Sequence, residues 1–224
     1  LALATGMSGL FLLAQPLFAF AGALAAVTVV YAFASRATVG DNTLLLSGVM
    51  IGAFLSAMIL ALVTTMERPV RNALFWLVGY LGGATMQEVL ILLPMVIILT
   101  VIALFAAGNM NILALGGEAA QHLGISVRRL QPLLYITASL LTAAVVSFSG
   151  AIGFVGLIVP HICRRLFGPD HRLLVPAAFL GGSSFLILSD IVARTVLHPS
   201  ELPVGAVTAA LGAPVFLYVM RRKS

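Results

Sequence analysis

A series of long apolar runs constrains this chain more than any other feature of its sequence. Each run is about 15–23 residues long, which is the length that an α-helix needs to cross ~30 Å of hydrocarbon. The runs are continuously apolar and do not alternate, so they predict helices and not the strands of a membrane barrel. We expect a remnant at about 1–14 and then seven complete spans, near residues 17–35, 43–65, 88–107, 130–149, 152–167, 173–196 and 203–220. The sequence therefore predicts an all-α, polytopic membrane helical bundle.

Composition excludes an ordinary soluble domain and several kinds of site. Hydrophobic residues make up 61% of the chain and charged residues 8%, with a mean hydropathy of +1.15, whereas a soluble domain carries about 25% charge. The net charge of +5 does not indicate nucleic-acid binding, because the basic residues lie between spans. Cys163 is the single cysteine, and the four histidines form no metal-ligand pair, so neither a disulfide framework nor a metal site is predicted. No glycine-rich stretch ends in the G-K-[ST] of a nucleotide-binding loop, so we expect no ATP site of that kind on this chain.

The distribution of arginine and lysine predicts how the chain crosses the membrane. If the C-terminal Arg221, Arg222 and Lys223 are cytoplasmic, alternation of the spans puts nine basic residues inside and three outside. The other six inside residues are Arg36, Arg128, Arg129, Arg164, Arg165 and Arg172, and the three outside residues are Arg68, Arg71 and Arg194. An excess of basic residues marks the cytoplasmic side of a membrane protein. We therefore expect a multi-pass membrane protein with its C-terminus in the cytoplasm.

The segment from Gly150 to Arg172, GAIGFVGLIVPHICRRLFGPDHR, is short for a membrane crossing. Pro160 and His161 interrupt its apolar half, which then passes into a basic loop. Ser149 and His161 are the only tempting pair for serine catalysis, but they fall towards opposite ends of one short segment, so no catalytic residue is predicted. We interpret His161 as a structural residue at a helix end.

The connection at residues 67–88, on the predicted outer side, is too structured for a simple linker. It contains NALFWLVGYLGG, whose Trp76 and Tyr80 suit the membrane interface. A short interfacial or re-entrant helix and a plain aromatic anchor are equally good interpretations.

The connection at residues 109–129, on the predicted inner side, reads NMNILALGGEAAQHLGISVRR. A short apolar stripe is broken at Gly116 and Gly117, and Gly124 ends its second half. We expect two short amphipathic helices here. They could dock another protein or lie on lipid headgroups, and the pattern alone leaves both alternatives open. The stripe consists of Leu113, Leu115, Ala119, Ala120 and Leu123.

Few charged residues fall within the spans, and they deserve a functional hypothesis because burying charge in a membrane is costly. Asp190 and Arg194 lie four residues apart, in the order that favours an ion pair on one helix face. Arg194 can also present its guanidinium outward to a carboxylate of a partner. Glu201 is a candidate cap for the start of the last span.

Glycines are frequent within the spans, for example Gly48, Gly52, Gly205 and Gly212. We interpret most of them as places where helix backbones approach closely, since lipid supplies no hydrophobic drive for helix association.

Four ordered segments together resemble one protein family. They are LALGGEAAQHLG, GAIGFVGLIVPHICRRLFGPDHR, SDIVAR and ELPVGAVTAALGAPVFLYVMRR. They are similar to segments of the permease subunits of bacterial ATP-binding cassette (ABC) importers of the FecCD/BtuC type, which import ferric siderophores, haem or vitamin B12. The resemblance covers about residues 40–223 and implies the type II importer permease fold of ten spans. The chain would then be a single transmembrane permease domain, residues 1–224, that lacks the first spans.

The resemblance also implies partners. Such permeases work as a dimer of two copies or halves in the bacterial inner membrane, over cytoplasmic ABC ATPases that hold ATP and Mg. They receive substrate from a periplasmic binding protein. The chain itself would carry no cofactor and catalyse nothing. An ion-coupled secondary transporter is the alternative function.

Matching the family's segments residue by residue implies three sets of roles. Residues 109–129 would hold the coupling helices that contact the ATPase, through Leu115, Gly116, Glu118, Ala119, Leu123 and Gly124. Arg194 and Glu201 would dock the binding protein. Gly150, Gly153 and Gly156 would border the translocation path. Gly117 and Gln121 stand where the family often has an acidic and a basic residue, so docking on the ATPase would depend more on shape than on charge.

Overall fold

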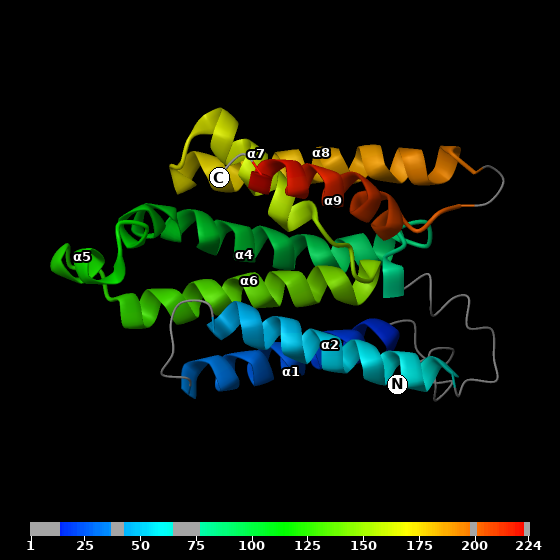
Figure 1. Ribbon diagram of the computed structural model, residues 1–224, viewed down its shortest axis with the longest axis horizontal. Helices are drawn as coiled ribbons and strands as arrows, with labels where there is room; N and C mark the ends of the chain where they lie inside the picture. The colour runs from blue at the N-terminus through cyan, green and yellow to red at the C-terminus, as the bar shows by residue number, and fades with distance from the viewer. Residues whose placement is uncertain (1–13, 37–42, 65–76, 198–200, 222–224) are drawn as a thin grey trace.

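The fold is a bundle of α-helices in which the long apolar runs form the helices (Figure 1). The structure is a computed structural model that describes residues 14–36, 43–64, 77–197 and 201–221. Every regular element in these ranges is an α-helix, which confirms the predicted all-α class. The helices are α1 (Ala14–Arg36), α2 (Thr43–Thr64), α4 (Met86–Leu113), α5 (Gly117–His122), α6 (Val127–Ser149), α7 (Val155–Phe167), α8 (His171–Thr195) and α9 (Val204–Arg221).

Five of these helices are long and apolar enough to cross a membrane. Their apolar stretches are Pro16–Phe33, Ser47–Thr64, Met86–Leu113, Val127–Ser149 and His171–Thr195. In the described part of α9 the apolar stretch is Val204–Val215, and α7 has 13 residues, about 20 Å at 1.5 Å per residue. Both are shorter than a crossing of ~30 Å. The predicted count of seven complete spans is therefore not confirmed, although a polytopic membrane bundle is.

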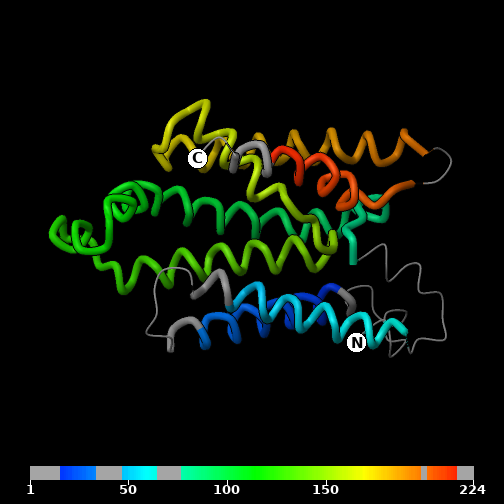
Figure 2. The backbone as a smooth tube through the Cα atoms, viewed as in Figure 1, coloured from blue at the N-terminus to red at the C-terminus, as the bar shows by residue number. Residues whose placement is uncertain are grey.

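The helices lie in three layers, with α4 and α6 in the middle (Figures 1 and 2). On one side α6 packs against α1, which packs against α2, and on the other side α4 packs against α8, which packs against α7 and α9. The buried residues of the middle layer are mostly small, for example Ala106, Ala107, Ala143 and Ala144, each at most 6% exposed. Small side chains let helix backbones approach closely, which is how helices associate in lipid.

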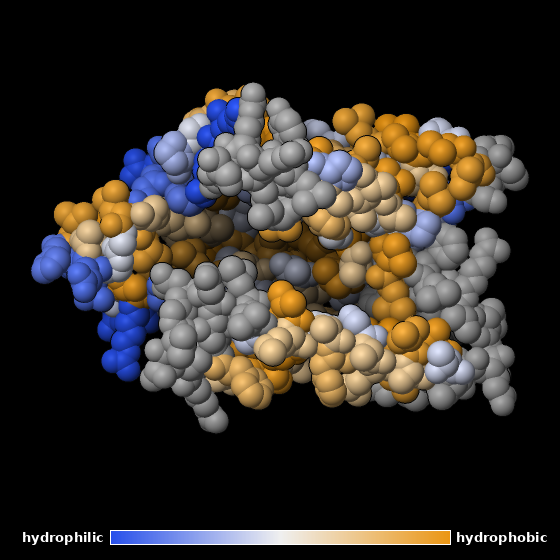
Figure 3. Space-filling view, in the orientation of Figure 1, coloured by the Kyte–Doolittle hydropathy of each residue, from blue (hydrophilic) through white to orange (hydrophobic). Residues whose placement is uncertain are grey.

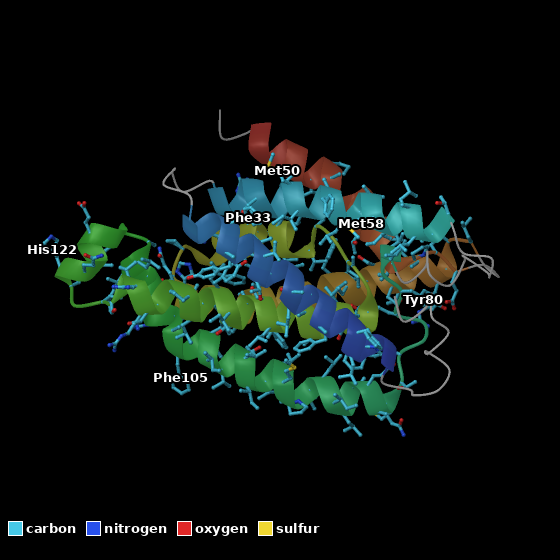
Figure 4. All side chains as sticks on the ribbon, turned by 90° about the horizontal axis from the view of Figure 1, so that it is seen from below. Phe33, Met50, Met58, Tyr80, Phe105 and His122 are labelled. Atoms are coloured by element: carbon cyan, nitrogen blue, oxygen red, sulfur yellow. The ribbon has the colours of Figure 1, made fainter. Side chains whose placement is uncertain are left out.

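Large apolar side chains cover the outside of the bundle. In the space-filling view apolar atoms surround its middle, and polar atoms gather at the α5 end (Figure 3). Phe105 of α4 is 85% exposed and points away from the neighbouring helices (Figure 4). The face seen in Figure 3 is also hollowed between the outer layers, and apolar atoms line much of this hollow. Such a surface suits lipid or a second membrane chain and not water.

The segment expected to cross at 152–167 is helical only from Val155 onward. Residues 150–154 are not helical, and Phe154 has a left-handed backbone with φ 68°. The helix continues through Pro160, so this proline does not interrupt it as expected. His161 lies in the middle of α7 and is half-buried, so its predicted place at a helix end is wrong.

A non-helical segment, residues 79–85, is held between the end of α6 and the start of α9. The backbone N–H of Tyr80 donates to the carbonyl of Ser149 at 3.0 Å, and that of Gly205 donates to the carbonyl of Gly79 at 3.3 Å. Trp76 and the rest of 67–76 lie outside the described residues, as do the expected remnant before residue 14, Arg68, Arg71, His198, Arg222 and Lys223.

Close packing explains some of the glycines and not others. A Cβ on Gly205 would overlap the carbonyl oxygen of Val78, and one on Gly212 would lie 2.5 Å from Cβ of Phe154. Both positions therefore require glycine. Gly48 and Gly52 in α2 have no described atom within 4 Å of an added Cβ, so the packing interpretation finds no support there within this chain.

Candidate functional site

The predicted docking segment folds as one short helix, α5, on the end of α4. Helix α4 runs to Leu113, so residues 109–113 form its last turn, and the expected pair of short helices is a single helix. Three backbone hydrogen bonds continue the chain without a gap into Gly116: Ala114 to Met110, Leu115 to Ile112 and Gly116 to Leu113. Gly116 has φ 111°, a conformation that glycine adopts at little cost, and this residue turns the chain into α5.

Glycine also ends α5. Gly124 has φ 83°, its N–H donates to the carbonyl of Gln121, and the N–H of Ile125 donates to that of Ala120. These two bonds are a Schellman motif, in which a left-handed residue satisfies the last carbonyls of a helix. The helix end predicted at Gly124 is thereby confirmed.

Two large exposed leucines flank α5, one before its first residue and one at its C-cap. Leu115 is 70% exposed and Leu123 60% exposed, whereas Ala120 is fully buried against the bundle. Glu118 is exposed and Ala119 is half-buried. This segment lies between the apolar stretches of α4 and α6, and exposed leucines outside a membrane span are typical of a surface that another protein or the lipid headgroups cover.

Basic residues surround α5 at the same end of the bundle (Figure 3). Exposed arginines occur at the start of α6, the end of α7 and the start of α8: Arg128, Arg129, Arg164, Arg165 and Arg172. These five residues were predicted to share one side of the membrane, and the structure places them at one end.

Asn111, near the end of α4, joins this end to the start of α8. Its Nδ2 donates to Oδ1 of Asp170 at 2.6 Å, and its Oδ1 accepts the backbone N–H of His171 at 2.8 Å and lies 2.7 Å from Nδ1 of that histidine. Asp170 also caps α8 by accepting the N–H of Arg172 at 3.0 Å. The hydrogen bonds from Arg172 and Asn111 lower the pKa of the Asp170 carboxyl below its ordinary value.

The second predicted site, Arg194 and Glu201, lies at the other end of the bundle. Nε of Arg194 donates to Oδ2 of Asp190 at 2.8 Å, and the arginine side chain remains 44% exposed. The predicted ion pair is confirmed, and the exposed guanidinium can still meet a carboxylate from outside. Tyr80, at this end, and His122 of α5, at the other, lie towards opposite ends of the molecule in Figure 4.

Glu201 is held by Tyr80. The Tyr80 hydroxyl donates to Oε2 of Glu201 at 2.6 Å, and no N–H in the described part of α9 donates to this carboxylate, so Glu201 does not cap α9 as expected. The hydrogen bond, together with partial burial and the negative charge of Glu201, raises the pKa of Tyr80 above 10.0, while the positive charge of Arg194 opposes the rise. Tyr80, Asp190, Arg194 and Glu201 therefore form one polar group, which we call the Tyr80-end cluster.

The three glycines expected along the translocation path lie around the non-helical link between α6 and α7. Gly150 ends α6, is buried and has φ 73°, while Gly153 and Gly156 are exposed, with no described atom within 4 Å of an added Cβ. Open space at the last two suits a path or a partner. Their role stays a prediction, because a path between two copies involves a second chain.

In the described part of the chain, neither a metal site nor a serine-histidine catalytic site is assembled. No group of three or more His, Cys, Asp or Glu residues comes together there. The hydroxyl of Ser149 donates to the carbonyls of Val145 and Gly150 and not to His161.

Comparison with known proteins decides the family. The sequence pattern of the FecCD transport family matches residues 1–222, nearly the whole chain. The chain belongs to the FecCD transport family. The resemblance stated from four sequence segments is thereby confirmed.

FecCD relatives are permeases of several import systems. The chain is 48% identical over 204 residues to the cobalamin import system permease protein BtuC of Halobacterium salinarum, covering 91% of this chain and 55% of that protein. It is 36% identical over 206 residues to the hemin transport system permease protein HmuU of Yersinia pestis, covering 92% and 62%. This FecCD chain thus spans between half and two thirds of the length of these relatives.

A solved structure shares the fold. It is described as an inward-facing conformation of a metal-chelate type ABC transporter, and it superimposes with a TM-score of 0.80 at 27% identity, covering 93% of this chain and 73% of that one. The helix arrangement of the FecCD chain is therefore that of a known ABC transporter chain.

Sequence reasoning missed two of the contacts that organise the ends of this FecCD chain. Asp170, in the GPDHR stretch before a span, carries the local signal of a helix cap. Asn111 lies 59 residues earlier, and no local pattern pairs the two. Tyr80 was recognised as an interface aromatic, but its bond to Glu201 spans 121 residues.

Proposed function

We propose that this chain is part of the transmembrane permease subunit of an ABC importer. It moves an iron-siderophore, haem or cobalamin-type substrate from a binding protein outside the membrane into the cytoplasm. Family membership supports the transporter class. The relatives' cobalamin and hemin systems support a bulky metal chelate as the substrate class.

The observation that carries the proposal is that an exposed leucine pair and an exposed polar cluster, our two candidate docking surfaces, lie at opposite ends of one bundle. One end presents Leu115 and Leu123, which flank α5 and lie outside the apolar stretches. The other end presents the Tyr80-end cluster with the exposed Arg194. An importer driven by an ATPase and loaded by a binding protein needs one such surface on each side of the membrane.

On this proposal α5 is the coupling helix and sits in the cytoplasm over the ATPase, through Leu115, Gly116, Glu118, Ala119, Leu123 and Gly124. The basic residues at that end support the orientation because arginine is enriched on the cytoplasmic side. The C-terminus would then be cytoplasmic in a bacterial-type inner membrane. Arg194 and Glu201 would face the binding protein.

The transport step is a conformational change and includes no covalent chemistry on the substrate. ATP binding closes two ATPases that hold ATP and Mg, α5 moves with them, and the helices rock between inward-open and outward-open states as rigid bodies. A second permease copy or half completes the path, bordered by Gly150, Gly153 and Gly156. The apolar lining of the hollow in Figure 3 supports a wall to which a polar chelate does not adhere.

Transport driven by ATP is tested in proteoliposomes with the full permease, its ATPase and its binding protein. The panel of probes is cyanocobalamin, haemin, ferric citrate and a ferric hydroxamate. We expect uptake of one probe that requires ATP and the ATPase. Uptake without ATPase, driven by a proton gradient, would instead establish the secondary transporter, which the pairing of Asp190 with Arg194 disfavours, since such carriers use free acids within the membrane.

A further inference from the structure

We propose that Asn111 is a positioning residue that ties the coupling helix α5 to the first turn of α8, so that movement of α5 reaches the opposite end of the bundle. The inference rests on the proposed function of α5. The structural element that carries it is the inner clamp, which we define as Asn111, Asp170 and His171.

The first step is that α5 moves with the end of α4. Hydrogen bonds from Ala114, Leu115 and Gly116 continue the backbone of α4 to the start of α5, and the N–H of Ala120 donates to the carbonyl of Gly116 at 3.0 Å. Ala120 is fully buried. A force on α5 or on the exposed leucines that flank it therefore acts on the last turn of α4, where Asn111 lies.

The second step is that Asn111 uses both atoms of its amide to hold α8. Nδ2 donates to Oδ1 of Asp170 and Oδ1 accepts the backbone N–H of His171, at 2.6 and 2.8 Å. One planar side chain thus binds the cap residue and the first residue of the same helix. Hydrogen bonds that involve a charged carboxylate are stronger than neutral ones, and the backbone contact makes the geometry insensitive to side-chain rotation in α8.

A second contact supports the same attachment. The guanidinium of Arg172 lies over Gly108 of α4, with Nη2 3.1 Å from the position of an added Cβ. The absence of a side chain at Gly108 lets the first turn of α8 lie against α4. Two consecutive turns of α4 therefore lie against the start of α8, and Asn111 binds it.

The third step is that α8 reaches the other docking surface. The helix has 25 residues, about 37 Å at 1.5 Å per residue, and its last turns carry the Asp190–Arg194 pair. It is continuous and packs against α4, α7 and α9. The inner clamp thus joins the ATPase end to the helix that carries Arg194.

The test measures substrate imported per ATP hydrolysed in proteoliposomes of the full permease with ATPase and binding protein, normalised to assembled complex. The probe is the panel member that the wild type imports. Asn111→Ala removes both bonds, and we expect this ratio to fall about fivefold or more, with ATPase affinity within about twofold of wild type, since the exposed leucines that we assign to ATPase contact remain. Asn109→Ala, an exposed asparagine on the same helix, is the matched control and should leave the ratio unchanged.

Two further variants separate positioning from folding. Asp170→Asn keeps an oxygen that can accept from Asn111 and from Arg172, so it should retain most of the coupling. Asn111→Asp keeps the size of the side chain and the acceptor for His171 but sets a carboxylate beside Asp170. It should therefore lower the amount of substrate imported per ATP hydrolysed, and it tests the inference even if Asn111→Ala fails to assemble. An import ratio equal to wild type in an assembled Asn111 variant would overturn the inference alone. A wild-type permease that imports no probe and binds no ATPase would overturn the proposed function instead.

Discussion

The hydroxyl of Tyr80 donates a 2.6 Å hydrogen bond to Oε2 of Glu201, a residue 121 positions later in the chain. The bond joins the segment before α4 to the turn before α9. It also holds a carboxylate near the Asp190–Arg194 ion pair, since both members of that pair affect the pKa of Tyr80. The surface opposite α5 therefore has a fixed arrangement of charges before any partner arrives.

The Tyr80–Glu201 bond predicts an unusual titration. The pKa of Tyr80 is raised above 10.0, so this tyrosine should ionise after an ordinary tyrosine. Stability from the bond is fully present below pH 10 and is lost as the pH rises through the raised pKa. The measurement is tyrosinate absorbance, taken as the difference between wild type and Tyr80→Phe because the chain has four tyrosines.

Glu201→Gln is the control for this titration. The variant removes the negative charge that opposes tyrosinate, so the pKa of Tyr80 should move back towards its ordinary value. Titration of Tyr80 at or below pH 10 in the wild type would contradict the geometry of the bond.

Reversing the charge of Arg194 should weaken docking of the binding protein and spare the ATPase. Arg194→Glu removes an exposed guanidinium and sets two carboxylates four residues apart, which costs only about 0.2–0.5 kcal/mol of helix stability. We expect affinity for the binding protein to fall about tenfold, with ATPase association unchanged. The measurement is binding of the labelled binding protein to nanodiscs that carry the permease.

Asp190→Asn separates docking from the ion pair. It weakens the pair but keeps Arg194, so binding-protein affinity should stay near that of wild type. Equal losses in both variants would mean that Arg194 acts through Asp190 and not on a partner.

A charge at Leu123, the C-cap of α5, should weaken ATPase association without unfolding the protein. Leu123 is 60% exposed, so Leu123→Asp should change stability by less than about 0.5 kcal/mol. Burying a leucine in an interface contributes about 1.5–3 kcal/mol, so ATPase affinity should fall about tenfold or more. Co-purification and titration with the ATPase measure the loss.

Leu197→Asp is the matched control for α5, because Leu197 is 52% exposed after the end of α8. It should leave ATPase affinity intact. Glu118→Lys, on α5 itself, should lower that affinity. Unchanged binding in both α5 variants would remove α5 from the ATPase interface.

Alanine should have opposite effects at two glycines that look alike in sequence. At Gly205 a Cβ would overlap the Val78 carbonyl, and such overpacking costs about 1–3 kcal/mol. At Gly48 an added Cβ meets no described atom within 4 Å, and alanine in a helix is favoured over glycine by about 0.5–1 kcal/mol. Thermal unfolding in detergent should show Gly205→Ala destabilised and Gly48→Ala slightly stabilised, and equal effects at the two sites would contradict the packing described here.

Local signals in the sequence predicted several features at the two ends of the helix bundle. Glycine at 116 and 124 predicted where α5 begins and ends, because left-handed turns depend on the residue that occupies them. The spacing of Asp190 and Arg194 predicted their ion pair for the same reason, since residues four apart meet on any helix. The separate helix expected in the part of 109–129 before Gly116 was wrong because the polar residues there do not stop α4, whose backbone bonds continue to Leu113.

The sequence by itself determined the helical class, the membrane setting and the family, because length and hydropathy of each run and the order of motifs are properties of local segments. Only the tertiary structure decided which distant residues meet. Asn111 with Asp170, Tyr80 with Glu201 and Gly205 with the Val78 carbonyl depend on how separate helices and turns pack. The physical reason is that a hydrogen bond or a close approach between remote segments follows from the path of the whole backbone, which no single segment encodes.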